Sequence, residues 1–180
     1  MEKKKTKRLS RWDYNYACLP EPKIKSWIPH NLLTQNAIKE ELKKNDFNVL
    51  DLKIDLAGYR HYLSNAEYHK FPGYYDGGKG SNFIEKSLEH HLAARLLDFS
   101  KDDIYIDIAS ANSPAPEIYQ KLYGCKVYRQ DLVFQEGMHG NSIGGNAYSM
   151  PVADSFATKM ALHCSFEHFE QDSDIRFIKE

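Results

Sequence analysis

The chain has 180 residues, enough for one ordinary domain with a core of its own. Its 24 Lys and Arg residues almost balance 25 Asp and Glu residues, so the formal net charge of −1 does not favour a protein that binds polyanions through its overall charge. The mean hydropathy is −0.63, and no apolar run approaches the about 18–20 residues of a membrane span. A hydrophobic fraction of 42%, with 13% aromatic residues, excludes a disordered or low-complexity chain.

The three cysteines, Cys18, Cys125 and Cys164, are far apart, and no C-x-x-C pair occurs. The spacing therefore predicts neither a zinc ribbon nor a thioredoxin-type site, and we expect no metal site. Reduced thiols are typical of a cytoplasmic protein, which is the location that we expect.

The N-terminus is basic, and no apolar segment follows it, so it is not a secretory signal. Six of the first eleven residues are Lys or Arg, which predicts a solvated tail. The tail also leaves open an RNA-binding protein, although no basic stripe downstream adds to it. Residues 1–30 as a whole, with their prolines, tryptophans and tyrosines, predict an irregular arm that packs through its aromatic rings.

Residues 31–99 predict a helical N-terminal extension. A helix is expected over 31–44, where apolar residues recur at helical spacing and two lysines close the last turn. Residues 48–54 favour a short strand. Asp55 is typical of an N-cap, and the apolar spacing after it predicts a second helix that reaches Ala66.

A third helix is predicted after Asn82, following a loop over residues 71–80 that contains four glycines. The spacing from Asn82 to Glu85 is typical of a capping box. Four apolar residues three to four positions apart predict the buried face of this helix: Ile84, Leu88, Leu92 and Leu96.

The sequence pattern changes over residues 100–180, where short apolar runs alternate with one helical pattern. Strands are predicted at 104–108, 126–130 and 159–163, a helix over 114–123 with Gly124 as its C′ residue, and a last helix from about Ile175. Strand, helix, strand, loop, strand in this order indicates parallel pairing and an α/β fold.

Small and polar residues follow the first of these strands. Asp107, Ala109, Ser110 and Asn112 lie where that strand ends and the next helix begins, and Asp131 closes the second strand. Such a turn lets a ligand approach the backbone at the carboxyl edge of a parallel sheet, where an acid can accept hydrogen bonds from ribose hydroxyls.

Residues 104–170 resemble the first half of a class I S-adenosylmethionine-dependent methyltransferase. That family has the pattern D-x-G-x-G-x-G, an acid ending the second strand, then G-D-A, L-P, D-x-S-F-D and an E-H ending. This chain has corresponding residues in the same order: Asp107-x-Ala109-x-Ala111-x-Ser113, Asp131, Gly145-Asn146-Ala147, Met150-Pro151, Asp154-Ser155-Phe156 and Glu167-His168-Phe169.

The resemblance implies an enzyme with a Rossmann-like sheet in the strand order 3-2-1-4 and S-adenosyl-L-methionine as its cofactor. The turn at 109–112 would border the methionine moiety, and Asp131 would hold the ribose. Three residues would flank the adenine, namely Asn146, Ala147 and Tyr148. His163 and Cys164 would face the methyl group and its acceptor.

The chain departs from the family pattern at the motif glycines, which are replaced by Ala109, Ala111 and Ser113. Alanine is strained where the backbone is left-handed. Too few residues separate Asp131 from Asn146 for the family's usual helix at that place.

Several residues are further candidates for the chemistry. A base could come from His163, Glu167 or His168, although Glu167 and His168 could also simply order the loop before the last helix. Tyr74, Tyr75 and Lys79 could close over the ligand.

The family's remaining strands are missing from this sequence, so we expect a fragment that ends after the fourth strand and self-associates through its exposed sheet edge. The expected partner is a small-molecule methyl acceptor, without a membrane or nucleic acid. The alternative is a truncated, non-catalytic module with this fold, or an adaptor between proteins.

Overall fold

The computed structural model describes residues 32–50, 52–80 and 82–179. The chain divides into two compact units, Met1–Ile54 and Asp55–Glu180. In the first unit, helix α3 (Leu32–Lys44) confirms the helix predicted over 31–44. The predicted arm over residues 1–30, with Cys18, lies outside the described residues.

The strand predicted over residues 48–54 is wrong, because none of its described residues is in a strand. Leu50, Leu52 and Ile54 are all exposed, at 71%, 44% and 47%. A strand needs a hydrogen-bonded neighbour, and apolar alternation without such a neighbour does not produce one.

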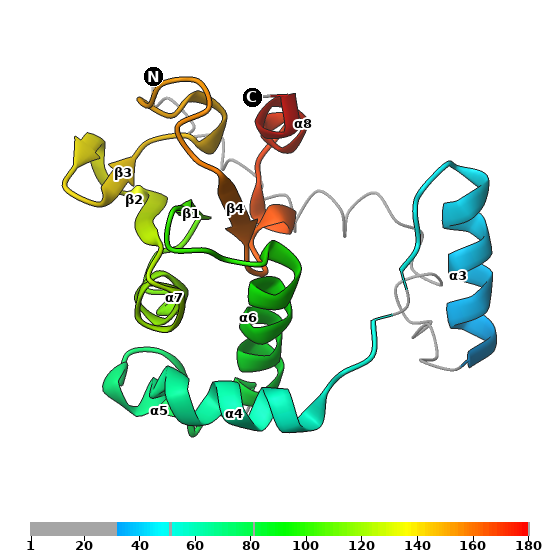
Figure 1. The fold of residues 1–180 in the computed structure, drawn as a ribbon. Coiled ribbons are helices and arrows are strands. Elements are labelled where there is room, and N and C mark those ends of the chain that lie inside the picture. The colour runs from blue at the N-terminus through cyan, green and yellow to red at the C-terminus, as the bar shows by residue number, and fades with distance from the viewer. Residues whose placement is uncertain (1–31, 51, 81, 180) are drawn as a thin grey trace, which may run out of the picture. The chain divides into compact units, whose positions relative to one another are not determined.

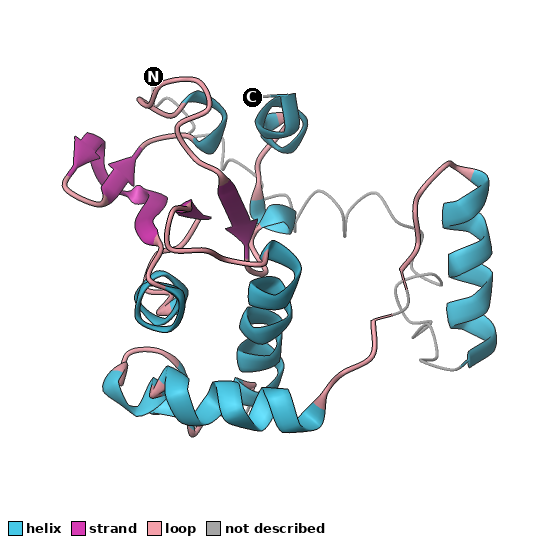
Figure 2. Ribbon diagram, viewed as in Figure 1, coloured by secondary structure: helices cyan, strands magenta, loops and turns pink. Residues whose placement is uncertain are grey.

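The second unit begins with helices and continues into a sheet (Figures 1 and 2). The helical elements before the sheet are α4 (Leu56–Ala66), η1 (Tyr68–Lys70), α5 (Tyr75–Gly78) and α6 (Phe83–Leu97). Asp55 caps α4 as predicted, since its carboxylate accepts a hydrogen bond of 3.0 Å from the Ala57 amide. The predicted capping box of α6 is wrong: Asn82 makes no side-chain cap bond, and its φ of −97° and ψ of 9° lack the extended form that an N-cap needs.

The sheet has four strands in the order β3-β2-β1-β4, paired in parallel, which confirms the predicted order. The strands are β1 (Ile104–Ile108), β2 (Lys126–His139), β3 (Ser142–Gly144) and β4 (Lys159–Leu162). Between β1 and β2 lies α7 (Ala115–Tyr123), which ends at Gly124 in the left-handed form, as predicted (φ 75°). The remaining elements are η2 (Ala147–Ser149), η3 (Phe166–His168) and α8 (Ser173–Lys179), the last beginning two residues before Ile175.

Two hydrophobic cores lie on the two faces of the sheet. Successive strand residues point to opposite faces, so Tyr105 packs with α4, α6 and α7, whereas Ile106 and Ile108 pack on the other face. Figure 1 shows α6 and α7 on one side of the sheet and α8 on the other. Among the described residues, no helix combines the length and apolar character that crossing a membrane requires.

The predicted buried face of α6 is wrong at its two ends, although Leu88 in its middle packs against the core. Ile84 and Leu96 are exposed, at 70% and 64%. The helix instead buries a stripe at the same helical spacing, formed by Ser87, His90, His91 and Ala94. This stripe faces the tyrosines of α4 and η1, whose hydroxyls supply hydrogen bonds: Tyr59 contacts Ser87 Oγ at 2.6 Å, and Tyr68 contacts His90 Nδ1 at 2.8 Å.

Strand β2 is longer than predicted because it pairs with β3 twice. Residues 129–131 pair with 142–144 in parallel, and residues 136–139 then face the same three residues with the register reversed. The chain turns back at Gly140, whose φ is 63°. The segment between Asp131 and Asn146 therefore contains this folded-back ribbon and no helix, in agreement with the short spacing.

We predict that Gly144→Ala destabilises the second unit by about 3 kcal/mol, because a Cβ at this position would collide with the backbone of Gln135 and lie 2.7 Å from the Phe134 carbonyl oxygen. Gly73→Ala is the matched control, since nothing lies within 4 Å of its added Cβ. Urea denaturation followed by circular dichroism measures both, and equal midpoints for the two variants would contradict the prediction.

Candidate functional site

Three of the predicted site residues share one face of the sheet at its carboxyl edge. Asp107 is the second-last residue of β1 and lies next to Ala161 of β4 and Arg129 of β2 in the register. Alternation along β2 and β4 then brings Asp131 and His163 to the face that α6 and α7 cover. The sheet therefore brings together acids that are 24 residues apart in the sequence.

Asp107 is a buried carboxyl group with an incomplete set of partners. It is only 1% exposed, and its Oδ1 accepts a hydrogen bond of 2.7 Å from the Tyr105 hydroxyl. Its Oδ2 has no hydrogen-bond partner among the described residues. Burial raises the pKa of Asp107 to about 7, against the lowering effect of hydrogen bonds from Tyr105 and Ser113.

His163 faces Asp107 from the residue after β4. Its Nε2 lies 3.7 Å from Asp107 Oδ1 and makes no hydrogen bond among the described residues. Burial lowers the pKa of His163 to about 4. Near pH 5 to 6 the imidazole is therefore neutral while the carboxyl group is mostly protonated, so this contact is not an ion pair.

The loop after β1 is attached to the interior of β2, where the pairing of β2 with β1 ends. The Ala111 amide donates to Asp131 Oδ2 at 2.7 Å, and the Ala109 amide donates to the Gln130 side chain at 3.1 Å. Asp131 also accepts from the Val133 amide at 3.1 Å. Ala109 and Ala111 are both left-handed, with φ of 52° and 39°, so they take the conformation that favours glycine at the positions where the resembling family has glycine.

The structure does not bring all the other predicted cofactor residues to the face of Asp107, because Ala147 packs into the core on the opposite face of the sheet. Asn112 donates to the Gly73 carbonyl at 3.0 Å, which joins the loop after β1 to the glycine-containing loop. Gln130 also donates to the Gly145 carbonyl at 2.6 Å, so the segment of the predicted adenine residues, which follows β3, is attached at its start to β2. Of these residues, Asn146 is exposed, Ala147 is buried, and the Tyr148 ring lies 3.7 Å below the Arg176 guanidinium.

Helix α6 contributes a histidine that the sequence did not mark as part of this site. His90 is buried beside His163, with 4.6 Å between ring centroids. Both ring nitrogens contact tyrosine hydroxyls, at 2.8 Å for Tyr68 and 3.2 Å for Tyr74. Burial lowers the pKa of His90 well below its usual range, so the ring is neutral.

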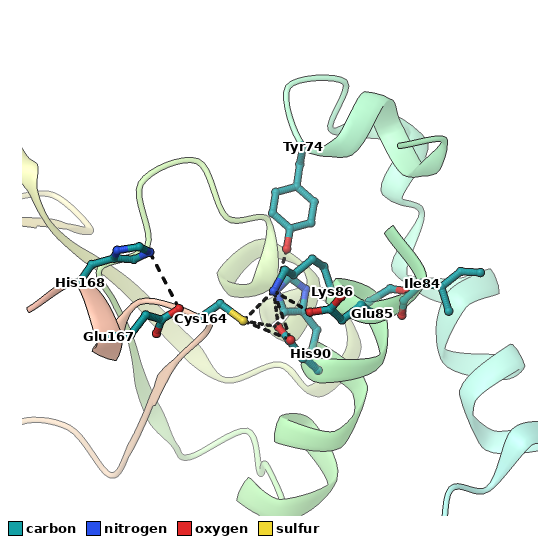
Figure 3. A network of polar contacts seen from close by, with 10 residues as sticks. Tyr74, Ile84, Glu85, Lys86, His90, Cys164, Glu167 and His168 are labelled. Atoms are coloured by element: carbon teal, nitrogen blue, oxygen red, sulfur yellow. Dashed lines mark hydrogen bonds and ion pairs between the residues drawn. The ribbon is translucent and has the colours of Figure 1, made fainter. Parts of the chain in front are cut away.

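A second polar cluster lies one turn earlier on α6, where Cys164 reaches Lys86 (Figure 3). Lys86 Nζ lies 2.6 Å from Cys164 Sγ and 3.2 Å from Glu89 Oε1. Burial disfavours the Lys86 charge, but the hydrogen bonds to Cys164 and Glu89 outweigh it and raise the pKa of Lys86. Glu85, Glu89 and Cys164 have ligand-type atoms within 4.8 Å of one another, and the Lys86 ammonium group contacts all three residues.

The remaining predicted candidates are more exposed. Glu167 and His168 lie on η3, both exposed, with 3.9 Å between Oε1 and Nε2. Tyr75 and Lys79 are exposed, whereas Tyr74 points to His90.

A cavity of about 250 Å³ lies on the other face of the sheet. Ile106 and Met160 form its floor, and its lining includes Met150, Phe156 and Phe177. It is mainly apolar and contains none of the predicted cofactor residues. We therefore place the candidate site at the carboxyl edge, where the polar groups converge, and not in this cavity.

The sequence missed Gln130, Lys86, Glu89 and His90 as parts of the polar clusters. Only the spacing of Lys86 and Glu89 on one helix face was a signal, because i and i+3 residues are neighbours. No local pattern shows that Cys164 meets them.

No protein-family model, curated protein or solved structure matches this chain.

We predict opposite effects of Asp107 and His163 on the pH dependence of stability. An Asp whose pKa rises from 3.8 to about 7 on folding makes the native state lose stability as the pH rises through that window. A His whose pKa falls from 6.5 to about 4 makes the native state lose stability as the pH falls through its window.

Asp107→Asn should therefore steepen the rise in the free energy of unfolding between about pH 4.5 and 6.5, and His163→Asn should flatten or reverse it. Urea denaturation at a series of pH values measures the slopes. Parallel slopes for wild type and both variants would contradict the burial of these two groups.

We predict that Ala111→Gly stabilises the second unit by about 0.5–1 kcal/mol. The left-handed backbone costs an L-residue about 1–2 kcal/mol, and glycine removes this cost. Part of the stabilisation is lost again because glycine has more conformational freedom in the unfolded chain. Ala111 is exposed, so no packing is lost. Ala153→Gly is the control, because Ala153 is an exposed loop alanine without a positive φ, and it should not stabilise; thermal unfolding compares the two.

Proposed function

We propose that the second unit binds S-adenosylmethionine at the carboxyl end of β1, beside Asp131 of β2, and belongs to a methyltransferase that acts on a small-molecule acceptor. The observation that carries the proposal is the loop after β1, which has left-handed alanines at motif-glycine positions and is held by Asp131. The strand order and the sequence resemblance over residues 104–170 support it.

The residues at this edge fit such a cofactor chemically. Asp107 Oδ2 and Ser110 Oγ are buried without a hydrogen-bond partner among the described residues. Asp131 uses two of about four acceptor positions of its carboxylate on backbone amides, which leaves acceptors for the two hydroxyls of a ribose. Both features suit a ligand that carries hydroxyl and amine donors.

When bound, S-adenosylmethionine supplies a sulfonium methyl group that a nucleophile can take. The chain's own contribution is to bind, align and exclude water. Asp131 and the loop after β1 form one side of the proposed site, because the Asp131 carboxylate accepts a hydrogen bond from the Ala111 amide and so attaches the loop to β2. The candidates for the adenine side, Asn146 and Tyr148, come shortly after β3. Gln130 of β2 holds the start of their segment by a hydrogen bond to the Gly145 carbonyl.

A proton from a hydroxyl or amine acceptor could be held at the Asp107–His163 contact. Asp107, with a pKa of about 7, is ionised in about half of the molecules at neutral pH, and neutral His163 has an unused ring nitrogen. A base whose pKa lies near the working pH is the most effective one.

A second candidate is a domain that binds the cofactor without catalysing transfer. The burial of Asp107 favours it, because a side chain that is 1% exposed is out of reach of an acceptor molecule in this conformation. Cofactor binding without transfer of a labelled methyl group to the small molecules of a cell extract would support this candidate.

We predict that S-adenosylhomocysteine binds the full chain in a calorimetric titration and that Asp131→Asn weakens binding about tenfold. The amide oxygen can still accept from Ala111, but it replaces a charged acceptor, and a hydrogen bond to a charged group is worth about 1.5–3 kcal/mol.

Asp102→Asn is the matched control, since Asp102 is an exposed acid just before the amino end of β1, and it should bind as wild type does. NAD should give no heat, which separates this site from a dinucleotide fold. A folded wild-type chain that does not bind S-adenosylhomocysteine would overturn the proposal.

A further inference from the structure

A lysine and a cysteine that are 78 residues apart in the sequence come into contact on α6. The distance from Lys86 Nζ to Cys164 Sγ is 2.6 Å, and Figure 3 shows Cys164 reaching this amine from the loop after β4. Cys164 is exposed to solvent, whereas the Lys86 side chain is only 14% exposed. A sulfur that solutes can reach therefore lies against an amine that is held in place.

Contacts with Glu89 and the local backbone conformation hold Lys86 and Cys164 in place. The Glu89 carboxylate accepts from Lys86 Nζ at 3.2 Å and from the Cys164 thiol at 3.1 Å, so one carboxylate orients both. Cys164 is left-handed, with a φ of 51°, a conformation that a non-glycine residue adopts only when its surroundings impose it. The backbone conformation of the turn after β4 therefore holds Cys164 where its sulfur contacts Lys86.

The ammonium group occupies the centre of the acidic cluster. Lys86 contacts Glu85 and Glu89 as well as Cys164, so a metal ion on these three residues would have to displace it. The arrangement favours chemistry between the amine and the sulfur instead.

We propose that Lys86 and Cys164 form a reversible covalent crosslink when a peroxide oxidises the thiol. In the first step Sγ takes one oxygen atom from hydrogen peroxide, which gives a sulfenic acid and one water molecule. In the second step the Lys86 ammonium group first gives one proton to Glu89 or solvent, and the neutral Nζ then attacks the sulfur. An N–S bond forms, the S–O bond breaks, and the hydroxyl group leaves with a second amine proton as a second water molecule.

The protons of both steps have acceptors. Glu89 is placed to take the thiol proton, which frees the sulfur lone pair for the peroxide. The ammonium group of Lys86 loses two protons in the second step, one to the departing hydroxide and one to Glu89 or solvent. Two molecules of a thiol reductant reverse the bond, returning the amine and the thiol and forming one disulfide.

The crosslink would fasten α6 to the turn that carries His163. It would therefore restrain the helix that closes one face of the sheet at its carboxyl edge. This inference concerns Lys86 and Cys164 alone and stands whether or not the chain binds S-adenosylmethionine.

The experiment uses the full chain carrying Cys18→Ser, so that no disulfide to Cys18 can form. Cys125 is buried and serves as an internal reference thiol. After hydrogen peroxide treatment, the intact mass should fall by two hydrogen atoms, and a thiol reductant should restore it. Tryptic peptide mapping should then give one crosslinked peptide pair that joins Lys86 to Cys164, with cleavage after Lys86 lost.

Lys86→Arg keeps the positive charge but offers no amine that can form the bond, so this variant should gain oxygen atoms at Cys164 and lose no hydrogen. Lys70→Arg, at an exposed lysine elsewhere in the unit, should crosslink as the parent does. Oxygen gain without crosslinking in the parent chain, or a crosslink from Cys164 to another lysine, would overturn the proposal.

Discussion

The carboxylate of Asp131 is the group on which the carboxyl edge of this sheet depends. It receives the amide of Ala111 from one strand connection and the amide of Val133 from its own strand. A loop with two left-handed alanines is strained, and it persists because bonds from neighbouring residues hold it. The shape of the edge is therefore set by a charged acceptor and not by glycines.

This arrangement explains how alanines can occupy a left-handed turn after β1. Glycine reaches a positive φ without steric cost, whereas alanine needs compensation from elsewhere. Here two hydrogen bonds compensate for the strain: the backbone amides of the two alanines donate to the side chains of Gln130 and Asp131. The same two residues also fasten the segment after β3, since the Gly145 amide lies 3.4 Å from the Asp131 carbonyl and its own carbonyl accepts from Gln130.

The second constraint is a row of buried polar side chains between α6 and the sheet, formed by His90, His163 and Asp107 and called here the polar seam. His90 and His163 are buried, and burial lowers the pKa of both, so the seam contains imidazoles without charge. Tyrosine hydroxyls satisfy His90, while Asp107 and His163 each keep one atom that has no partner in the described part of the chain. Buried polar atoms without partners are costly, and such groups concentrate where a structure binds or reacts.

The sequence by itself determined β1, β4, the first residues of β2 and the parallel pairing, because these depend on residues close together in the chain: apolar β-branched runs and a helix between two strands. The strand order was an expectation from the family resemblance, and the sequence did not predict β3 or the continuation of β2 to His139. It did not determine the buried face of α6, where apolar periodicity pointed to Ile84 and its neighbours. The tyrosines of α4 and η1 offer hydrogen bonds to Ser87 and His90, so the polar stripe is the one that packs. Only tertiary structure also brought Cys164 to Lys86, because the contact joins a turn after β4 to a helix before β1, and no local pattern carries information across that separation.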